Sequence, residues 1–334
     1  MSDVKPILEV RDLKMHFPVH GGLLFRRVAT VYALDGVSFD VRPGETVGIV
    51  GESGCGKSTL GKTILRLYDP TEGKVLFQGR DLAHVHGREL RTMRKDLGII
   101  FQDPYESLNQ THPVGFILEE PFLIHGVGSP EQRRAWAREL LHKVGLPESA
   151  LDRYPHEFSG GQRQRIGIAR AIALNPKLVI CDEPVSALDV SIQSQILNLL
   201  LTLQKEMGLA YIFIAHDLAV VKHVSDRIAV MYLGKIVEFA DADDLHHRPL
   251  HPYTQALLAS IPEPDPSRSV EDKPVLEGEI PSPSNPPPGC RFHTRCPYAQ
   301  PRCKTEVPAL SPWADAGQAH RVACHYAGAL QPKA

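Results

Sequence analysis

Short apolar runs separated by polar segments recur along the chain. Thr46–Val50, Leu97–Phe101, Leu178–Cys181 and Ala210–Ala215 each contain four to six residues, most of them apolar. Runs this short and this apolar predict strands of a parallel sheet that are buried on both faces. Arg163–Leu174 instead predicts an amphipathic helix, because its apolar residues fall on one face: Ile166, Ala169, Ile172 and Ala173. The alternation predicts an α/β fold.

The first 85 residues have a different pattern. Ile7–Leu13, Ala33–Val41 and Lys74–Phe77 predict strands joined by turns. Arg88–Lys95 and Glu131–Val144 predict helices, and the second carries acidic residues early and basic residues late, as the helix dipole favours. The sequence therefore predicts a strand-rich N-terminal part, followed by a part that mixes helices with buried strands.

Composition excludes several functional classes. The 334 residues are 43% hydrophobic and carry 37 basic against 39 acidic residues, so the net charge of −2 offers no electrostatic basis for binding nucleic acid. No apolar run approaches the roughly 18–20 residues that span a bilayer. Met1–Lys5 lacks the apolar core of a signal peptide. We expect a cytoplasmic protein that reaches a membrane only through other subunits.

A phosphate-binding loop follows the first apolar run. Gly51, Gly56, Lys57 and Ser58 satisfy G-x-x-x-x-G-K-[ST] between a predicted strand and a helix that starts near Leu60. In such a loop the lysine contacts the β- and γ-phosphates, and the hydroxyl that follows it binds Mg²⁺. The remaining predicted contacts to the nucleotide come from Ser53, Gly54, Cys55 and Thr59.

Candidate catalytic residues follow three other apolar runs. Asp182 and Glu183 come directly after Leu178–Cys181, at the strand end where ligands bind in α/β sheets. We expect Asp182 to hold Mg²⁺ and Glu183 to polarise the attacking water. His216 ends the next run and is a candidate γ-phosphate sensor. Gln102 ends Leu97–Phe101 and is placed to reach the metal or the water.

A second anion site is predicted at Ser159, Gly160, Gly161 and Gln162. They open the amphipathic helix, where backbone amides bind anions without a charged side chain. A single domain has no need of two phosphate cradles for one nucleotide. We therefore expect two such domains to close around ATP.

Together these motifs resemble the nucleotide-binding subunit of an ABC transporter. The resemblance implies a P-loop NTPase fold at residues 1–255, with an antiparallel β subdomain and a helical subdomain at about 103–157. It also implies that Ser159–Gln162, the signature of this family, caps ATP bound by the other subunit. Ser186–Asp189 resembles the loop that passes between the two sites. Phe17 lies where the family stacks an aromatic ring on adenine, with Tyr32 as the alternative.

The C-terminal region, residues 256–334, is rich in proline and cysteine. Nine prolines fall between Pro262 and Pro288, which favours an extended connector. Four cysteines follow with the spacing C-x5-C-x6-C-x20-C: Cys290, Cys296, Cys303 and Cys324. Disulfides are disfavoured in a reducing cytoplasm, whereas four clustered thiolates suit a metal or an iron–sulfur cluster. The spacing does not decide between zinc and iron–sulfur, and His293 and His325 are alternative ligands.

The resemblance narrows with His251-Pro252-Tyr253, the proline connector and these cysteines. They are similar to the ATPase subunits of dipeptide and oligopeptide importers, particularly to the second of two paralogous ATPases of a dipeptide permease. The likeness implies a 4Fe-4S cluster on the four cysteines. It also implies a partner ATPase, two membrane permease subunits and a solute-binding protein, with this chain at the cytoplasmic face of the inner membrane.

Three alternatives stay open at this stage. Importers of nickel or other small solutes share the architecture, and the subunits that choose the substrate are not encoded here. A soluble ABC ATPase acting on DNA or ribosomes would require an inserted coiled coil or tandem ATPase domains, and the sequence has neither. In the third alternative, the cysteine tail senses a metal and uses the ATPase as a switch.

Overall fold

A computed structural model describes residues 5–21, 26–261, 278–313 and 319–328. Residues 1–4 and most of the proline-rich connector, residues 262–277, lie outside this range, so the predictions made for them are not addressed. The chain divides into two compact units, each discontinuous in sequence. Unit 1 comprises residues 1–7, 41–46 and 84–214, and unit 2 comprises residues 8–40, 47–83 and 215–334. In the described part of the chain, no helix has the length and apolar character needed to cross a membrane.

Unit 1 is built on three parallel strands, β6 (Leu97–Ile100), β7 (Leu178–Asp182) and β8 (Ala210–Ile214). Every residue of β7 and β8 is buried, which confirms the prediction of parallel strands covered on both faces. The helices of this unit are α2 (Gly87–Met93), α3 (Pro104–Ser107), α4 (Val114–His125), α5 (Pro130–Lys143), α6 (Gly160–Ile172) and α7 (Val190–Met207).

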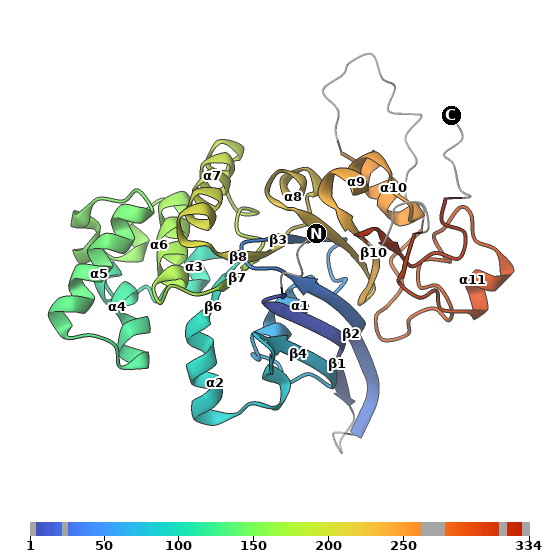
Figure 1. Cartoon of the computed structure of the whole chain (residues 1–334), viewed down its shortest axis with the longest axis horizontal. Coiled ribbons are helices and arrows are strands. Elements are labelled where there is room, and N and C mark those ends of the chain that lie inside the picture. The colour runs from blue at the N-terminus through green and yellow to red at the C-terminus, as the bar shows by residue number, and fades with distance from the viewer. Residues whose placement is uncertain (1–4, 22–25, 262–277, 314–318, 329–334) are drawn as a thin grey trace, which may run out of the picture. The chain divides into compact units, whose positions relative to one another are not determined.

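Helices α4, α5 and α6 pack against one another in unit 1 (Figure 1). Short 3₁₀ turns complete the unit at Arg94–Asp96, Glu148–Asp152 and Pro155–Glu157. The predicted helices at Arg88–Lys95, Glu131–Val144 and Arg163–Leu174 are present as α2, α5 and α6, with ends displaced by one to three residues.

Unit 2 contains two groups of strands. An antiparallel sheet has the order β2–β1–β4–β5, formed by β1 (Leu8–Gly21), β2 (Arg26–Val41), β4 (Glu72–Phe77) and β5 (Arg80–Asp81). The second group is β3 (Thr46–Val50, within this unit from residue 47 on), β9 (Arg227–Tyr232), β10 (Lys235–Asp241), β11 (Ser311–Pro312) and β12 (Arg321–Val322). Strand β3 runs parallel to β9, which pairs antiparallel with β10, and β12 joins the far edge of β10.

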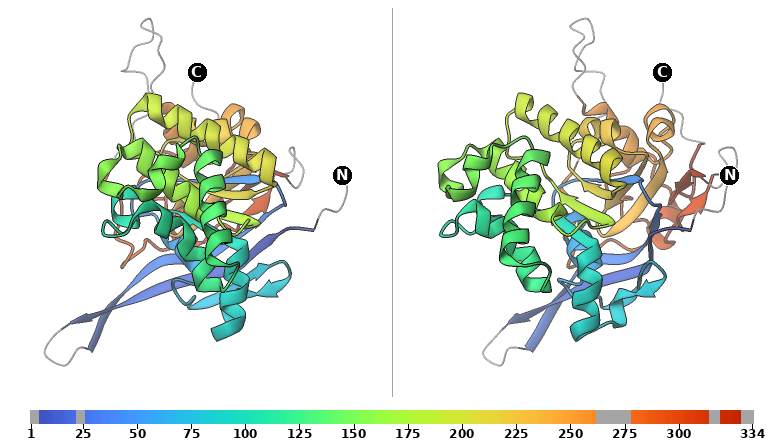
Figure 2. Two further views of the ribbon diagram at one scale, coloured as in Figure 1. Left: turned by 90° about the vertical axis from the view of Figure 1, so that its left-hand side faces the viewer. Right: turned by 60° about the vertical axis from the view of Figure 1, so that its left-hand side comes forward.

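The helices of unit 2 are α1 (Lys57–Ile64), α8 (Leu218–Val224), α9 (Ala242–His247), α10 (Pro252–Ala259) and α11 (Pro301–Thr305). A 3₁₀ turn, Leu82–His84, begins where the segment of residues 47–83 ends. Strands β1 and β2 form a long pair that extends well beyond the predicted Ile7–Leu13 and Ala33–Val41 (Figure 2). Their outer halves are largely exposed, so no apolar alternation marks them in the sequence.

Candidate functional site

The phosphate loop lies between β3 and α1 in unit 2, where the sequence places it. Gly51 and Gly56, the two glycines of the motif, cannot be replaced by a residue with a side chain. A Cβ on Gly51 would lie 2.2 Å from the Met231 carbonyl oxygen, and one on Gly56 would lie 2.2 Å from the Ala33 carbonyl oxygen. Both also have positive φ, 153° and 109°. The loop therefore keeps its course only with glycine at these positions.

Lys57 begins α1 and is almost fully buried. Its Nζ donates to the carbonyl oxygens of Gly51 at 2.7 Å and Glu52 at 3.1 Å, so the ammonium lies inside the curve of the loop. The N-cap residue of α1 is Gly56, which has no side chain to make a capping hydrogen bond. The first amides of α1 and the partial positive charge of the helix end therefore suit an anion.

Unit 1 brings two predicted catalytic residues into contact. Strand β7 ends at the buried Asp182, and Glu183 follows with a left-handed backbone (φ 46°). The Glu183 amide donates to the Ile214 carbonyl oxygen of β8 at 2.9 Å, which fixes this turn. Gln102 Nε2 donates to Glu183 Oε2 at 3.0 Å. A strained backbone of this kind in a non-glycine residue is concentrated at functional sites.

The signature residues open α6 in unit 1. Ser159 is the N-cap: its Oγ accepts from the Gln162 amide, and Gln162 Oε1 accepts from the Ser159 amide. Ser159, Gly160 and Gln162 are exposed. A Cβ on Gly161 would lie 2.6 Å from Ile192 Cγ2, so a small residue is required there. Phe158 is buried beneath Arg153, whose guanidinium lies 4.4 Å from the ring centre.

His216 and Phe17 belong to unit 2, together with the phosphate loop. His216 is exposed and precedes α8, which Asp217 caps by accepting from the Ala219 amide at 2.8 Å. The Phe17 ring is partly exposed and meets Tyr68 edge-on, with 5.3 Å between ring centres. Unit 1 thus holds Gln102, Asp182, Glu183 and the signature, and unit 2 holds the phosphate loop, His216 and Phe17.

The two cysteines outside the tail lie in the packed core. Cys55 and Cys181 are buried, and burial raises the pKa of both thiols. The tail cysteines are arranged differently, because all four line one small cavity of about 20 Å³ together with His293 and His325. Burial raises the pKa of Cys290 and of Cys296 to about 11, so neither thiol ionises readily by itself.

The described part of the tail does not form a metal site as it stands. Among the described residues, no three His, Cys, Asp or Glu side chains are grouped closely enough to hold a metal ion. The donor types are suitable for zinc or an iron–sulfur cluster. The cavity, however, has room for little more than one water molecule. The thiols would have to move apart to admit a cluster.

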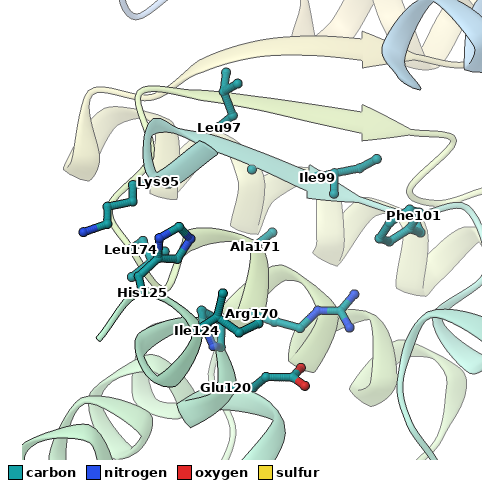
Figure 3. A pocket seen from close by; sticks show the side chains of 12 residues that line it. Lys95, Leu97, Ile99, Phe101, Glu120, Ile124, His125, Arg170, Ala171 and Leu174 are labelled. Carbon is teal, nitrogen blue, oxygen red and sulfur yellow. The ribbon is translucent and has the colours of Figure 1, made fainter. Parts of the chain in front are cut away.

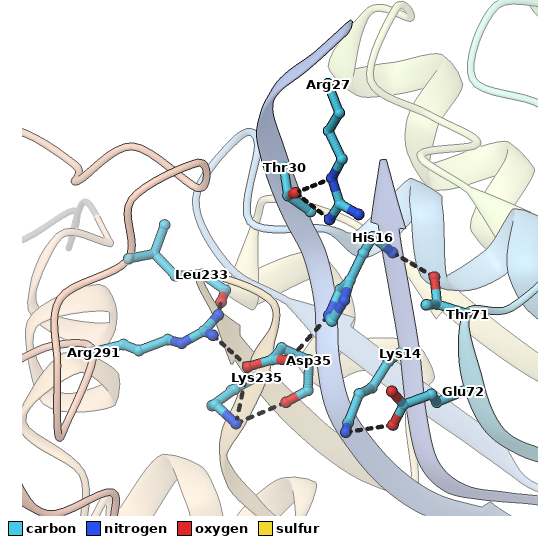
Figure 4. Close-up of polar contacts among 10 residues, drawn as sticks. All are labelled: Lys14, His16, Arg27, Thr30, Asp35, Thr71, Glu72, Leu233, Lys235 and Arg291. Atoms are coloured by element: carbon cyan, nitrogen blue, oxygen red, sulfur yellow. Dashed lines mark hydrogen bonds and ion pairs between the residues drawn. The ribbon is translucent and has the colours of Figure 1, made fainter. Parts of the chain in front are cut away.

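A polar network fixes the start of the tail to the antiparallel sheet (Figure 4). Arg291 pairs with the Asp35 carboxylate and donates to the Leu233 carbonyl oxygen. Lys235 Nζ donates to the Asp35 carbonyl oxygen at 2.7 Å, and His16 Nε2 lies 3.1 Å from Asp35 Oδ1. Burial acts to raise the pKa of Asp35, but the charges of Lys235 and Arg291 outweigh it and lower that pKa. The carboxylate therefore stays ionised and holds the network.

A pocket of about 320 Å³ lies in unit 1 between β6, α4 and α6 (Figure 3). Its walls are mainly apolar, with four charged or titratable side chains at Lys95, Glu120, His125 and Arg170. Arg170 Nη1 donates to the Ser107 carbonyl oxygen at 2.6 Å, which ties α6 to the end of α3. Ile124 lines the pocket and is half exposed.

Comparison with known proteins identifies two regions of the chain. Residues 34–186 match a family model described as ABC transporter. Residues 237–303 match one described as the C-terminal region of oligopeptide/dipeptide transporters. The oligopeptide transport ATP-binding protein AppF of Bacillus subtilis is 55% identical over 97% of this chain and 98% of its own length. A probable peptide ABC transporter ATP-binding protein of Sinorhizobium fredii is 54% identical over 97% of this chain and 90% of its own.

Solved structures agree with the sequence comparison. A dimer of the ATP-binding cassette MJ0796, in a post-hydrolysis state with ADP and Pi, superposes with a TM-score of 0.63 at 31% identity. The match covers 70% of this chain and 98% of that one. A second dimeric structure of MJ0796 gives a TM-score of 0.62 at 30% identity, with the same coverage. The P-loop NTPase fold of the ABC type, expected from the motifs, is confirmed.

Proposed function

The chain belongs to the ABC transporter family, in its oligopeptide and dipeptide branch, and we propose that it hydrolyses ATP to drive the import of short peptides. One observation supports the peptide substrate most directly. A single chain matches both the ABC transporter model and the model for the C-terminal region of oligopeptide/dipeptide transporters. The relatives named above are described as peptide-transport proteins, and this chain matches them over nearly their whole length.

The chemistry of ATP hydrolysis follows from the side chains present. Lys57 and the amides of residues 53–59 bind the phosphates, and Phe17 stacks on adenine. Glu183 accepts a proton from the attacking water while Gln102 holds its carboxylate in place, and His216 donates to the γ-phosphate. The water oxygen bonds to the γ-phosphorus as the bond from that phosphorus to the bridging oxygen breaks, so ADP leaves with the bridging oxygen. A general base of this kind contributes about 10²–10⁴-fold to the rate.

The oxygen donors that the motifs supply are of a type that suits magnesium. The Ser58 hydroxyl and the Asp182 carboxylate are hard oxygen ligands of the type that Mg²⁺ prefers, and Gln102 supplies an amide oxygen. Asp182 is buried at the end of β7, where a cation would compensate the cost of an ionised carboxylate. When bound, Mg²⁺ neutralises charge on the phosphates.

We place the signature of this chain in the site of a partner subunit. Ser159, Gly160 and Gln162 are exposed, and both of the related solved structures named above are dimers of one cassette. The partner is a paralogous ATPase, and the complex also contains two membrane permease subunits and a solute-binding protein. The chain meets the membrane only through the permease subunits, at the inner face of the cell membrane. The pocket beside β6 and α4 receives a segment of one permease subunit.

For the tail, we propose that the four cysteines hold a 4Fe-4S cluster that stabilises its fold. The supporting observation is that they line one cavity although 34 positions separate the first from the last. The chain purified without oxygen would be analysed for iron, sulfide and zinc, alongside Cys303→Ser. Iron and sulfide that disappear in the variant support the cluster. Zinc in their place supports a zinc site, and neither element would leave four thiols.

The transport function is tested with the assembled complex. The chain is purified with its partner ATPase and permease subunits, and ATP turnover and dipeptide uptake into vesicles are measured for wild type and Glu183→Gln. We expect both activities to require the permease subunits and to fall about 10²–10⁴-fold in the variant. Turnover by the isolated chain that ignores Glu183 would contradict the proposal, and nickel uptake without peptide uptake would reassign the substrate.

A further inference from the structure

Glu52, the second residue of the phosphate loop, is held at three points. Its carbonyl oxygen accepts from Lys57 Nζ at 3.1 Å. Its amide donates to the Tyr253 hydroxyl at 2.9 Å. Its carboxylate accepts from both terminal nitrogens of Arg295, at 2.7 Å and 3.1 Å. Two of these three partners come from the C-terminal part of the chain, about 200 residues and more away in sequence.

Tyr253 is rigidly placed for this contact. It is completely buried at the start of α10, where Pro252 occupies the first turn and His251 caps the helix by accepting from the Tyr253 amide at 3.1 Å. Its ring packs against Tyr232 and Phe292, with ring centres 4.8 Å and 5.4 Å apart. The His-Pro-Tyr element thus starts a helix and aims one hydroxyl at the phosphate loop.

Arg295 is equally restricted, because its side chain is only 5% exposed. The guanidinium lies over the Tyr232 ring, 5.9 Å from its centre. Its position in the sequence is between two cysteines of the tail cavity, directly before Cys296 and five residues after Cys290. Arg291, directly after Cys290, is bound to Asp35. The segment from Arg291 to Arg295 is therefore held by an ion pair at each end.

The charge of Glu52 makes this pairing relevant to nucleotide binding. A carboxylate within a loop that binds phosphates repels the ligand, because both carry negative charge. A two-pronged arginine contact neutralises the carboxylate and fixes its direction. The Tyr253 hydroxyl also occupies the Glu52 amide, which orients the peptide plane at the start of the loop.

We propose that Arg295 and Tyr253 are positioning residues of the nucleotide site, which hold Glu52 so that the phosphate loop accepts ATP. The C-terminal tail then completes the phosphate loop rather than forming a separate appendage. The inference rests on the proposed binding of ATP by this loop. It assigns to Arg295 an effect on nucleotide affinity that passes through the charge of Glu52.

The experiment is a charge-rescue series in the full-length chain purified without oxygen. Binding of a non-hydrolysable ATP analogue with Mg²⁺ is measured by calorimetry for wild type, Arg295→Ala, Glu52→Gln and the double variant. We expect Arg295→Ala to bind about tenfold more weakly, because a charge-assisted contact is lost. The double variant recovers to within about threefold of wild type, because the repelling carboxylate is gone as well.

Two further variants separate positioning from folding. Arg302→Ala removes an exposed arginine of the same tail, paired with Glu306, and leaves affinity unchanged. Arg295→Lys keeps the charge without the two-pronged geometry, so its affinity lies between wild type and Arg295→Ala. Thermal melting is recorded for every variant. In the assembled complex, the KM for ATP rises in Arg295→Ala while kcat stays within about twofold.

Two outcomes would overturn the inference. Unchanged affinity in Arg295→Ala removes any link between the tail and the loop. Weakened affinity that Glu52→Gln does not recover makes Arg295 a structural residue of the tail. Lys57→Ala tests the proposed ATP site independently. Unchanged nucleotide binding in this variant would show that ATP does not bind at this loop.

Discussion

Gln102 and Glu183 are two predicted catalytic residues whose side chains meet within unit 1. The donor of this hydrogen bond is the Gln102 amide nitrogen, and the acceptor is the Glu183 carboxylate. Its backbone is held in a left-handed turn by β8. A carboxylate aligned from two directions is suited to a base, because its direction toward water is set before ATP arrives.

Gln102→Ala is expected to lower kcat about tenfold, with a smaller change in KM, because one orienting hydrogen bond is lost. Combined with Glu183→Gln, it should cause little further loss, since both changes act on the same carboxylate. Steady-state ATP turnover of the assembled complex measures this. Gln195→Ala is the control, because Gln195 is an exposed glutamine that accepts a hydrogen bond from Arg165. Multiplicative losses in the double variant would show that Gln102 acts elsewhere.

His251 gives the fold a dependence on pH. Burial lowers its pKa to about 4, although the nearby Glu238 acts to raise it. In the unfolded chain a histidine has a pKa near 6.5. As the pH falls from 6.5 to about 4, the unfolded state therefore binds a proton that the folded state does not, and stability decreases. The full contribution is about 3 kcal/mol, and it is present above pH 6.5.

Urea unfolding of wild type and His251→Asn between pH 7.5 and 4.5 isolates the contribution of His251 to the free energy of unfolding. Asparagine also accepts a hydrogen bond as an N-cap but does not titrate. The variant should be less stable at pH 7.5, because the packing on Phe292 is lost, yet its free energy of unfolding should fall less with pH. Parallel pH curves for the two proteins would assign the acid sensitivity to other groups.

At the residue scale, the sequence predicts chemistry but not partners. Gly51, Lys57 and Asp182 are recognisable because short spacing and a neighbouring strand define their surroundings. The Glu52–Arg295 pair joins residues 243 positions apart, and neither lies in a pattern that indicates the other. Such a contact depends on where the tail packs, which local periodicity does not encode.

At the element scale, α5 and α6 begin with the same capping motif, but only that of α6 lies in a predicted functional site. Each starts with a serine N-cap and a glutamine three residues later, and the two form a reciprocal capping box: Ser129 with Gln132, and Ser159 with Gln162. Removing either serine hydroxyl should destabilise its helix by about 1 kcal/mol. Only the second serine lies in the signature.

Ser129→Ala and Ser159→Ala therefore form a matched pair. Both should lower the melting temperature by a similar amount. Only Ser159→Ala should reduce ATP turnover in the assembled complex, by about tenfold, because its hydroxyl is also needed for the nucleotide of the partner. Equal turnover in the two variants would make Ser159 a cap alone.

The pocket between β6, α4 and α6 provides a second prediction at this scale. Ile124→Asp places a charge in its apolar wall. Docking of a permease segment should weaken at least tenfold, because an unpaired carboxylate would be desolvated. Co-purification of the permease subunits and peptide uptake should both decline, while nucleotide binding by the isolated chain stays unchanged. Val190→Asp, at an exposed apolar residue on α7, is the control.

Strands that are buried on both faces are the elements best predicted from sequence. β3 matches Thr46–Val50 at both ends, and β7 and β8 match to within one residue. The outer halves of β1 and β2 were not predicted, because they are stabilised by pairing with each other and leave their side chains in solvent. Helix α4 was not delimited either, because it is apolar around much of its surface and lacks a clear period of 3.6.

At the scale of the whole molecule, each chain presents half of two proposed sites. The phosphate loop of unit 2 and the exposed signature of unit 1 serve different nucleotides, if the signature caps ATP on the partner. ATP then favours the closed dimer only while the γ-phosphate persists, since a ligand shifts an equilibrium by its differential affinity for the two states. A variant that binds ATP but cannot hydrolyse it should accumulate in the closed state.

Glu183→Gln is that variant, because it removes the base but keeps the phosphate loop and the signature. With ATP and Mg²⁺ it should elute as a dimer in size-exclusion chromatography, and with ADP as a monomer. If the partner is a paralogous ATPase, the dimer should form with that subunit in preference to a second copy of this chain. Adding Ser159→Phe, which blocks the signature, should abolish the dimer without preventing ATP binding. A dimer that survives this change would place the interface away from the signature, and the cap on the nucleotide of the partner would have to come from another surface.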